Sequence, residues 1–275
     1  MEKIIEIRAS GEGFPVILRE YLRKIGLSTA IIKEAKRTAI LLNGESVTVR
    51  ATVNEGDVLE VYLPDEKSEG IEPMDIPLTV IYEDEDILAV DKPTNMPTHP
   101  SKGNNLPTLA NAVMGYYSGN FVFRAINRLD RDTSGVVIIA KNRLSATALA
   151  DGMKRGEWKK IYHALVDGVP SERNGVIDAP IERIAEGNIK RCVRADGKRA
   201  ITEYTVKEEY CDSSLLSIEL KTGRTHQIRV HMAHIGHPLC SDFLYGKPSE
   251  REYFLRCKEI TFIHPKSKQK ITIKS

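Results

Sequence analysis

Near the N-terminus, apolar positions recur at mixed helical spacing, first in residues 16–25 and then in residues 31–35. Gly26 is placed to end the first predicted helix, because glycine readily adopts the left-handed conformation that follows many helices. Ser28 is placed to cap the second, because its hydroxyl can accept a backbone N–H of the first turn. The pattern therefore predicts a pair of short helices.

Strand patterns follow these two helices. Asn43-Gly44 stands between two apolar runs, which is a strong hairpin signal, and residues 47–49 are expected to form the returning strand. Apolar and polar residues then alternate over residues 58–63, as in a half-buried strand. Residues 1–64 are therefore predicted to be a small separate domain. The polar, acidic and proline-bracketed residues 65–77 are predicted to link it to the rest of the chain.

From residue 78 onward, strand patterns outnumber helical ones, and residues 78–275 are predicted to form a second domain. Strands are expected at residues 78–82, 87–91, 136–140, 159–166, 200–209, 215–220 and 254–262. Helices are expected at residues 108–116, at 143–154 with Leu144, Ala148, Leu149 and Met153 facing inward, and at 226–235. A hydrophilic, basic stretch at residues 182–200 is compatible with either a loop or a hairpin.

The composition indicates an ordinary globular protein. The chain has 275 residues, 28% of them charged and 41% apolar, and its net charge of +2 leaves nucleic acid possible only where basic residues cluster. The charged N-terminus does not resemble a secretory signal, and no apolar run reaches the roughly 20 residues of a membrane helix. Its four cysteines form no C-x-x-C pair. We expect a reduced, cytoplasmic protein without membrane partners.

The central stretch, residues 127–135, carries the chemistry that needs an explanation. Arg128, Asp130, Arg131 and Asp132 alternate in charge, and a small-residue turn leads from them into the apolar run 136–140. Such a run is typical of a strand buried on both faces. Placing charged side chains beside a core costs free energy, and chains keep such charges most often at functional sites. The pattern therefore favours a functional site. The alternative is an Arg–Asp ion-pair loop that only ties strands together.

Three motifs occur in order along the chain. They are Asn127-Arg128-Leu129-Asp130-x-x-Thr133-Ser134-Gly135, Lys160-Ile161-Tyr162-x-Ala164-Leu165-Val166, and Leu220-x-Thr222-Gly223-Arg224-Thr225-His226-Gln227-Ile228-Arg229-Val230-His231. Together they resemble the pseudouridine synthases of the large-ribosomal-subunit and tRNA type, the RluA-like family, over roughly residues 78–265. The resemblance implies an α+β catalytic domain with a mixed, mainly antiparallel sheet, and isomerisation of uridines in RNA without a metal or organic cofactor.

The resemblance also implies roles for individual residues. Asp130 would be the catalytic carboxylate, which either attacks the anomeric carbon or removes the neighbouring proton to form a glycal. Arg229 would hold Asp130 charged and oriented, and Tyr162 would stack on the extruded base. Asp132 is the rival by charge pattern alone, although an Asp at this position can bond the turn backbone instead. The commonest family form has His where this chain has Asn127, so any role of that position in proton transfer is in doubt.

Basic residues indicate where RNA would bind. The paired helices of residues 11–64 resemble a small RNA-binding domain first described in a small-subunit ribosomal protein, and a basic patch there would attract phosphate. A uridine in folded RNA must flip out to react, so basic residues beside Asp130 would hold the backbone. The candidates are Arg19, Arg23, Lys33, Lys36 and Arg37 in the first domain, and Arg124, Arg128, Arg131 and Arg224 in the second.

Other functions compete with this interpretation. The histidines 226, 231, 234 and 237 suggest zinc, but their spacing lacks an i, i+4 pair around a Glu, so RNA contact or a structural role is favoured. A non-catalytic RNA-binding factor would use the same two domains. A glycosidase-like hydrolase would use Asp130 with Asp132 and would release free base. We expect a monomer that acts on structured RNA (rRNA or tRNA) and has no obligate protein partner.

Overall fold

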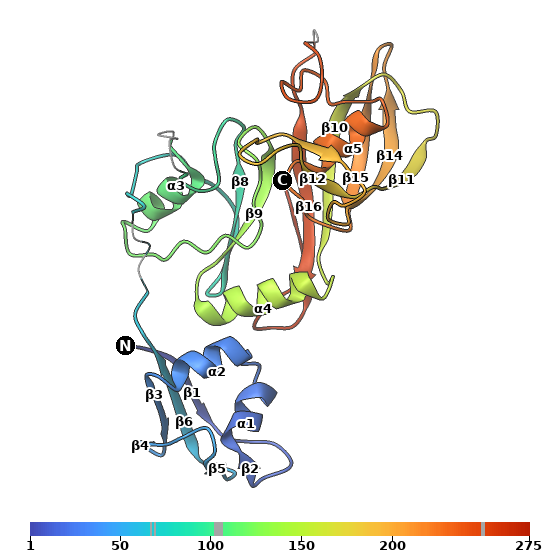
Figure 1. The fold of residues 1–275 in the computed structure, drawn as a ribbon. Coiled ribbons are helices and arrows are strands. Elements are labelled where there is room, and N and C mark those ends of the chain that lie inside the picture. The colour runs from blue at the N-terminus through green and yellow to red at the C-terminus, as the bar shows by residue number, and fades with distance from the viewer. Residues whose placement is uncertain (67, 69, 102–106, 249–250) are drawn as a thin grey trace.

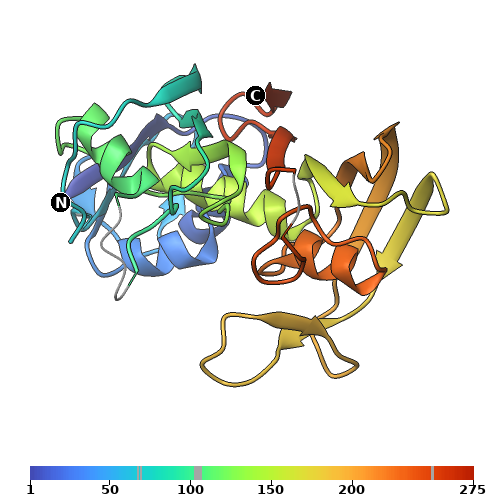
Figure 2. The ribbon, with the colours of Figure 1, turned by 90° about the horizontal axis from the view of Figure 1, so that it is seen from above.

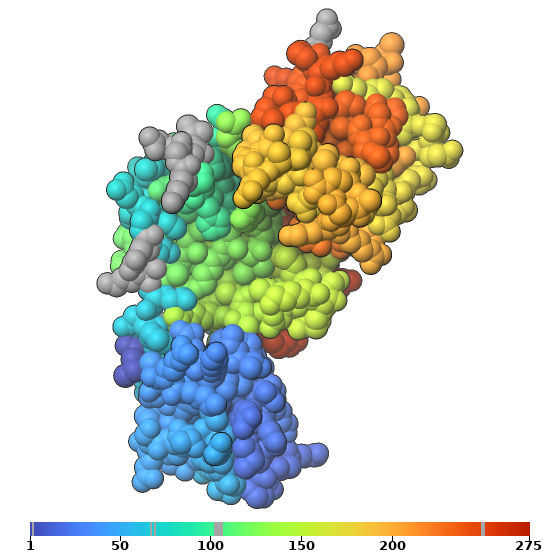
Figure 3. All heavy atoms as spheres, viewed as in Figure 1, coloured from blue at the N-terminus to red at the C-terminus, as the bar shows by residue number. Residues whose placement is uncertain are grey.

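The computed structural model describes residues 1–66, 68, 70–101, 107–248 and 251–275. The chain forms a small N-terminal lobe and a larger C-terminal lobe, which are visible as separate bodies in Figures 1 and 3. Each lobe has its own hydrophobic cluster of buried side chains. Among the described residues, no helix has the length and apolar character needed to span a membrane.

The N-terminal lobe packs two short helices on a small antiparallel sheet. Its elements are β1 (Glu2–Arg8), β2 (Val16–Ile17), α1 (Leu18–Lys24), α2 (Thr29–Ala35), β3 (Ala39–Leu42), β4 (Glu45–Ser46), β5 (Thr52–Val53) and β6 (Val58–Leu63). The sheet order is β1-β6-β3-β4. Apolar side chains of both helices and of β6 are buried together in one core. The helical spacing of apolar residues in α1 and α2 and their alternation in β6 both place these side chains toward that core.

Most local predictions for this lobe are confirmed. Both helices form, the Ser28 hydroxyl accepts the Ile31 N–H at 3.3 Å, and Asn43 and Gly44 make the hairpin turn with positive φ. The predicted strand at residues 47–49 is wrong. The chain turns there instead, and the carbonyl of Val49 accepts a backbone N–H from Arg19 at the start of α1. The pattern also missed β1, which pairs with β6.

The C-terminal lobe is built on one nine-stranded sheet. Its elements are β7 (Thr79–Glu83), β8 (Ile87–Lys92), α3 (Leu109–Tyr116), β9 (Ser134–Ala140), α4 (Arg143–Lys154), β10 (Lys159–Asp167), β11 (Asn174–Asp178), β12 (Ile181–Arg183), β13 (Arg191–Val193), β14 (Ile201–Glu209), β15 (Ser213–Leu220), α5 (Gln227–His234), β16 (Leu255–Ile263) and β17 (Lys270–Lys274). The strand order is β11-β14-β15-β10-β16-β9-β8-β7, with β17 beside β16. β9 and β16 run parallel and the other pairs described are antiparallel, which confirms the predicted mixed, mainly antiparallel α+β fold.

The predicted elements of this lobe are all present, but β11 and β17 were not predicted. The stretch at residues 182–200 is a hairpin of β12 and β13, which projects from the body beside α5 (Figure 2). Leu149 of α4 is buried in the C-terminal core as expected. Leu144, which was expected to do the same, packs against the core cluster of the N-terminal lobe instead.

Ion pairs join the two lobes where α4 faces the N-terminal one. The guanidinium of Arg143 lies 3.1 Å from a Glu66 oxygen and 3.2 Å from a Glu34 oxygen, and its side chain is only 9% exposed. Arg124 also bonds Glu66, through its Nε at 3.0 Å. Beyond Glu66, Ile71 packs on the C-terminal core, so the segment predicted as a linker lies partly against that lobe. The domain limits at residues 64 and 78 stay a prediction.

The parallel contact between β9 and β16 requires a glycine. Gly135 pairs with Cys257 and has φ +110, a conformation that other residues rarely adopt. A Cβ at this position would lie 2.2 Å from the Cys257 carbonyl oxygen, which is backbone and cannot move aside. The end of the central charged stretch is therefore fixed against a strand from the far end of the chain.

We expect Gly135→Ala to lower the free energy of unfolding by about 3 kcal/mol, because it combines a strained φ with overpacking. Gly44→Ala is the matched control, since Gly44 also has positive φ but nothing lies within 4 Å of the added methyl. It should cost only about 1 kcal/mol. Urea unfolding of both variants measures the difference. Equal losses would contradict a close contact at Gly135.

Candidate active site

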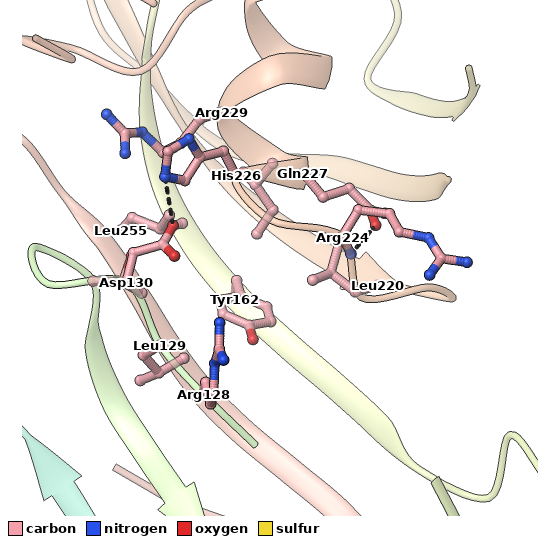
Figure 4. Close-up of a pocket in the computed structure, with 12 residues that line it drawn as sticks. Arg128, Leu129, Asp130, Tyr162, Leu220, Arg224, His226, Gln227, Arg229 and Leu255 are labelled. Atoms are coloured by element: carbon pink, nitrogen blue, oxygen red, sulfur yellow. Dashed lines mark hydrogen bonds and ion pairs between the residues drawn. The ribbon is translucent and has the colours of Figure 1, made fainter. Parts of the chain in front are cut away.

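A pocket opens where the three sequence motifs meet. The stretch 127–135 forms one wall, Tyr162 of β10 forms the floor, and residues 220–229 leading into α5 form the opposite wall. Of the described residues that line it, Asp130 alone carries a carboxylate. Figure 4 shows Asp130 and His226 facing each other across the pocket, with the Arg224 guanidinium directed away from Asp130.

Buried side chains hold the loop that carries Asp130 from behind. Asn127 donates through Nδ2 to the Val136 carbonyl at 3.0 Å and accepts the Ile138 N–H at 2.8 Å. The Thr98 hydroxyl bonds both backbone groups of Leu129, donating to its carbonyl at 2.9 Å and accepting its N–H at 3.3 Å. These bonds fix the peptide immediately before Asp130. Asn127 therefore attaches the loop to β9.

A buried lysine ties the same loop to the end of β8. The Lys92 ammonium is fully buried and donates to the carbonyls of Pro93, Met96 and Arg131, at 2.8, 2.6 and 3.0 Å. Burial lowers the pKa of Lys92 to about 8, although the charges of Asp132 and Asp130 act in the opposite direction. Its positive charge therefore lies beneath both carboxylates of the loop. Sequence analysis did not single out Lys92.

The two aspartates of the loop have different surroundings. The side chain of Asp130 is 36% exposed and lines the pocket, and its backbone carbonyl accepts the Thr133 N–H at 3.1 Å to close the turn. The Asp132 carboxylate is paired outside the pocket with both Nε and Nη2 of its neighbour Arg131, at 2.9 and 3.0 Å. The geometry thus presents Asp130 to a ligand and engages Asp132 locally.

Tyr162 lies below Asp130 on β10, opposite Cys257 of β16. Its side chain is 7% exposed. Burial raises the pKa of Tyr162 well above its ordinary value, and the negative charge of Asp130 adds to the effect. The phenol therefore stays neutral, and the ring presents a flat surface at the floor of the pocket.

Arg229 corrects one expectation about the pocket. Its guanidinium was expected to hold Asp130, but it forms a bidentate pair with Asp242, at 2.7 and 2.6 Å. Both side chains are almost fully buried, and Asp242 also accepts the N–H groups of Leu244 and Tyr245. The nearest ionisable partner described for Asp130 is His226 at 3.9 Å. No periodicity or spacing pointed to Asp242.

The guanidinium of Arg229 also lies among aromatic rings. The ring centres of Phe243, Tyr245 and Tyr253 are 4.9, 5.1 and 5.7 Å from its Cζ. This enclosure and the Asp242 pair hold the guanidinium rigidly in the wall of the pocket. Its charge still acts on Asp130 over a longer distance, since Asp130 contributes to the electrostatics of Arg229.

Gln227 organises the opposite wall. Its amide oxygen accepts from the Thr222 hydroxyl and the Arg224 N–H, and its amide nitrogen donates to Ile201 and Thr202, all within 3.0 Å. One buried amide thus fixes the turn that enters α5.

The histidines around α5 have separate partners. His231 bonds the Thr202 hydroxyl at 2.9 Å and the Ala179 carbonyl at 2.8 Å, and His237 bonds the Asp167 carbonyl at 2.9 Å. The ring of His226 points into the pocket, and His234 is exposed. These directions support structural tasks for His231 and His237.

The residues predicted to contact RNA fall into three groups. Arg128, Arg131 and Arg224 are exposed around the pocket, although Arg224 donates to the Arg199 carbonyl at 3.0 Å and Arg131 pairs with Asp132. Arg124 is different, because its guanidinium is bound to Glu66 and to backbone carbonyls at the junction of the lobes. The five candidates of the N-terminal lobe are exposed on α1, on α2 and directly after α2: Arg19, Arg23, Lys33, Lys36 and Arg37.

The family model for RNA pseudouridylate synthases matches residues 86–234, which include the loop of Asp130, Tyr162 and the start of α5. This chain belongs to the RNA pseudouridylate synthase family. It is an RNA-modifying isomerase, and the expectation drawn from the three motifs is confirmed. The catalytic roles of individual residues remain proposals.

Relatives of this synthase span most of its length. An uncharacterized RNA pseudouridine synthase of Bacillus subtilis (strain 168) is 37% identical over 256 residues, covering 90% of each chain. A ribosomal large subunit pseudouridine synthase D of Xanthomonas campestris pv. campestris is 37% identical over 249 residues, covering 89% of this chain and 74% of the relative. The solved human RNA pseudouridylate synthase domain containing 1 is 26% identical with a TM-score of 0.62, covering 72% of this chain and 83% of that one.

Outside the pocket, the synthase has a cluster of two carboxylates and a histidine at the turn from β7 to β8. Asp84, Asp86 and His264 place their ligand atoms within 4.8 Å of one another. Asp84 accepts the N–H groups of Asp86 and Ile87 at 2.8 Å each, and its other oxygen bonds His264 at 2.8 Å. Asp86 bonds Asn142 and Ser145 at the start of α4. These contacts join the turn, α4 and the end of β16, which is a structural task.

Lys92 makes the stability of the synthase depend on pH in alkaline solution. Its pKa is about 8 in the folded protein and 10.5 as an ordinary lysine, so between these values the unfolded chain binds the proton and the folded protein does not. Stability therefore rises with pH across this window. We expect the unfolding free energy of wild type minus that of Lys92→Met to increase by about 3 kcal/mol as the pH rises through this window.

Urea unfolding at several pH values measures this difference. Lys154→Met is the control, because the Lys154 side chain is 77% exposed. Its difference from wild type should stay flat across the window. If the difference between wild type and Lys92→Met also stayed constant with pH, burial would not lower the pKa of Lys92.

Proposed function

We propose that this chain isomerises uridines in structured RNA, with Asp130 as the catalytic carboxylate, and that its substrate is large-subunit ribosomal RNA. One observation carries the assignment: the carboxylate presented to the pocket is Asp130, over the ring of Tyr162 and beside the turn into α5. The choice of ribosomal RNA is supported by the several relatives named as large-subunit synthases, at 36–39% identity. We further propose that the protein acts as a monomer in the cytoplasm.

The reaction exchanges one bond for another at the same sugar carbon. The bond between base N1 and C1′ breaks, the uracil turns within the pocket, and C5 bonds to C1′. The C5 proton passes to solvent and N1 takes up a proton, so that the product is an isomer of uridine. Positive charge develops at C1′ as the first bond breaks, and an ionised carboxylate stabilises it. Asp130 serves either by attacking C1′ or by removing the C2′ proton to give a glycal. Both routes return the carboxylate unchanged and need no oxidant or reductant.

The surroundings of Asp130 suit this task. Lys92 beneath the loop and Arg229 in the wall both bring positive charge toward this carboxylate. The loop is held by Asn127 and Thr98, so the carboxylate is positioned before substrate binds. Arg229 acts at a distance from within its pair with Asp242, so in this structure it supports the site electrostatically and does not grip Asp130.

Tyr162 has a packing role in this proposal. Its ring at the pocket floor gives the extruded uracil a flat partner, and base stacking on aromatic side chains is common in RNA recognition. Because its pKa is raised, the phenol is not a base at neutral pH. Its hydroxyl assists the C5 proton only as a neutral donor or acceptor.

Two basic surfaces would hold the RNA. Arg128, Arg131 and Arg224 surround the pocket, and the exposed residues of α1 and α2 form a second surface on the N-terminal lobe. Arg124 is not part of this proposal, because its guanidinium holds the lobes together. The two surfaces together favour a folded RNA, whose backbone can reach both.

Substitution of Asp130 tests the proposed catalytic residue. With unmodified ribosomal RNA carrying tritium at uridine C5, we expect Asp130→Asn to reduce tritium release to background, because the amide cannot stabilise positive charge at C1′. Asp132→Asn is the matched control, since that carboxylate pairs with Arg131 outside the pocket and should leave release within a few-fold of wild type.

The outcomes separate the alternatives. Undiminished release by Asp130→Asn would overturn its role. RNA binding by the wild type without release, from either ribosomal RNA or tRNA of cells lacking the protein, would identify a non-catalytic binding factor. Release from tRNA alone would correct the proposed substrate, and free uracil would indicate a hydrolase.

The basic surface of the N-terminal lobe should control binding and not chemistry. We expect Arg23→Ala combined with Lys33→Ala to raise KM while kcat stays within twofold. The slope of log affinity against log salt should become shallower by about 0.7 for each phosphate that the variant no longer neutralises. Lys270→Ala, an exposed lysine on β17, is the control and should change neither quantity. An unchanged slope in the double variant would exclude this surface from the RNA interface.

A further inference from the structure

His226 is held in an unfavourable backbone conformation at the entrance to α5. Its φ is 57° and its ψ is 20°, the left-handed region that residues other than glycine rarely occupy. Its side chain caps none of the helix N–H groups. Such strain persists where surrounding contacts impose it, and it concentrates at functional sites. The contacts of Gln227 fix the residue that follows, and the imidazole of His226 points into the pocket toward Asp130 (Figure 4).

The hydrogen bonds behind the ring determine which nitrogen carries the proton. The Tyr245 hydroxyl accepts the backbone N–H of Arg191 at 2.9 Å and lies 2.8 Å from Nδ1 of His226. A phenol has one proton to donate, and Nδ1 is the acceptor within reach. Donation to Nδ1 leaves the ring proton on Nε2. The reverse tautomer would direct a lone pair at the Asp130 carboxylate, which is electrostatically unfavourable.

The protonated Nε2 faces the carboxylate of Asp130. The Nε2–Oδ2 distance is 3.9 Å, so an approach of about 1 Å completes a hydrogen bond. Burial lowers the pKa of His226, with Arg229 and Arg191 in the same direction and Asp130 and Asp242 opposed, so the ring is neutral at physiological pH. A neutral donor orients the carboxylate without forming an ion pair with it.

We propose that His226, oriented by the Tyr245 hydroxyl, is a positioning residue that donates from Nε2 to Asp130 when substrate closes the pocket. This inference rests on the proposed function of Asp130. It also connects the site to the hairpin of β12 and β13, because Arg191 on that hairpin shares the Tyr245 hydroxyl and Lys190 lies 5.6 Å from the Tyr245 ring centre. The hairpin is therefore in direct contact with the residue that orients His226.

Substitutions at His226 separate positioning from packing. His226→Gln keeps an N–H donor close to the position of Nε2, whereas His226→Phe keeps a ring without a donor. We expect the Phe variant to lose about tenfold or more in kcat with KM within twofold, as for loss of a hydrogen bond made in the transition state. The Gln variant should recover most of the loss. Tyr245→Phe, which no longer orients the imidazole, should fall between them.

The dependence of kcat on pH gives a second readout. Below its pKa, His226 becomes an imidazolium that pairs with Asp130, so the wild-type kcat should fall on the acid side as this group titrates. The charged groups facing the ring are Asp130, Asp242, Arg229 and Arg191. In His226→Gln the group is absent, and kcat should stay level to lower pH. His234→Gln and His234→Phe are matched controls, because His234 is exposed on the same helix and should leave kcat and its pH profile unchanged.

Nitrogen NMR of the free protein provides a readout that does not depend on activity. We expect His226 to be the Nε2–H tautomer in wild type and a mixture of tautomers in Tyr245→Phe. A wild-type Nδ1–H tautomer would overturn the proposal, as would equal activities of the Gln and Phe variants, whether both are retained or both are lost. A wild-type protein that binds RNA but releases no tritium would instead refute the proposed function, leaving the tautomer measurement to decide the orientation of His226.

Discussion

The hydrogen bonds that hold the Asp130 loop from behind are the constraint on which the pocket depends. Lys92, Thr98 and Asn127 are all buried, and each bonds backbone groups of the loop or of β9. Burying an ammonium costs free energy that its three carbonyl partners only partly offset, as its lowered pKa records. In return, the loop presents one carboxylate to the pocket in a fixed position, and catalysis by a carboxylate depends on that placement.

The site has the same organisation on its other side. Gln227 makes four hydrogen bonds that hold the turn before α5. Asp242 accepts two from Arg229 and two more from backbone N–H groups. Each fixes a neighbouring residue that faces the pocket. Few residues therefore face the pocket directly, and buried polar side chains hold them in place. Such networks stabilise a structure when every polar group in them has a hydrogen-bond partner.

The sequence was most informative where structure depends on near neighbours. Helix periodicity, the Ser28 cap and the Asn43-Gly44 turn are local, and all were predicted correctly. The returning strand at residues 47–49 failed because backbone contacts with α1 decide that segment. For the pocket, the family resemblance selected Asp130 and Tyr162, but the partner of Arg229 was expected to be Asp130 and is Asp242. Lys92, Thr98 and Tyr245 were not found, because the choice of a polar partner depends on packing between segments that are distant in sequence.

The parallel pairing of β9 with β16 also has a consequence for the order in which the protein is made. Ser134 and Gly135, directly after the Asp130 loop, pair with Arg256 and Cys257, close to the end of the chain. Contacts between such distant segments form late, since the intervening loop must first be closed, and a chain emerging from the ribosome completes its C-terminal strands last. A nascent or truncated chain that lacks β16 therefore has the N-terminal lobe and its basic surface but an unfinished pocket. The hydrophobic cluster of the N-terminal lobe does not depend on this pairing, whereas the pocket is complete only once β16 has reached β9.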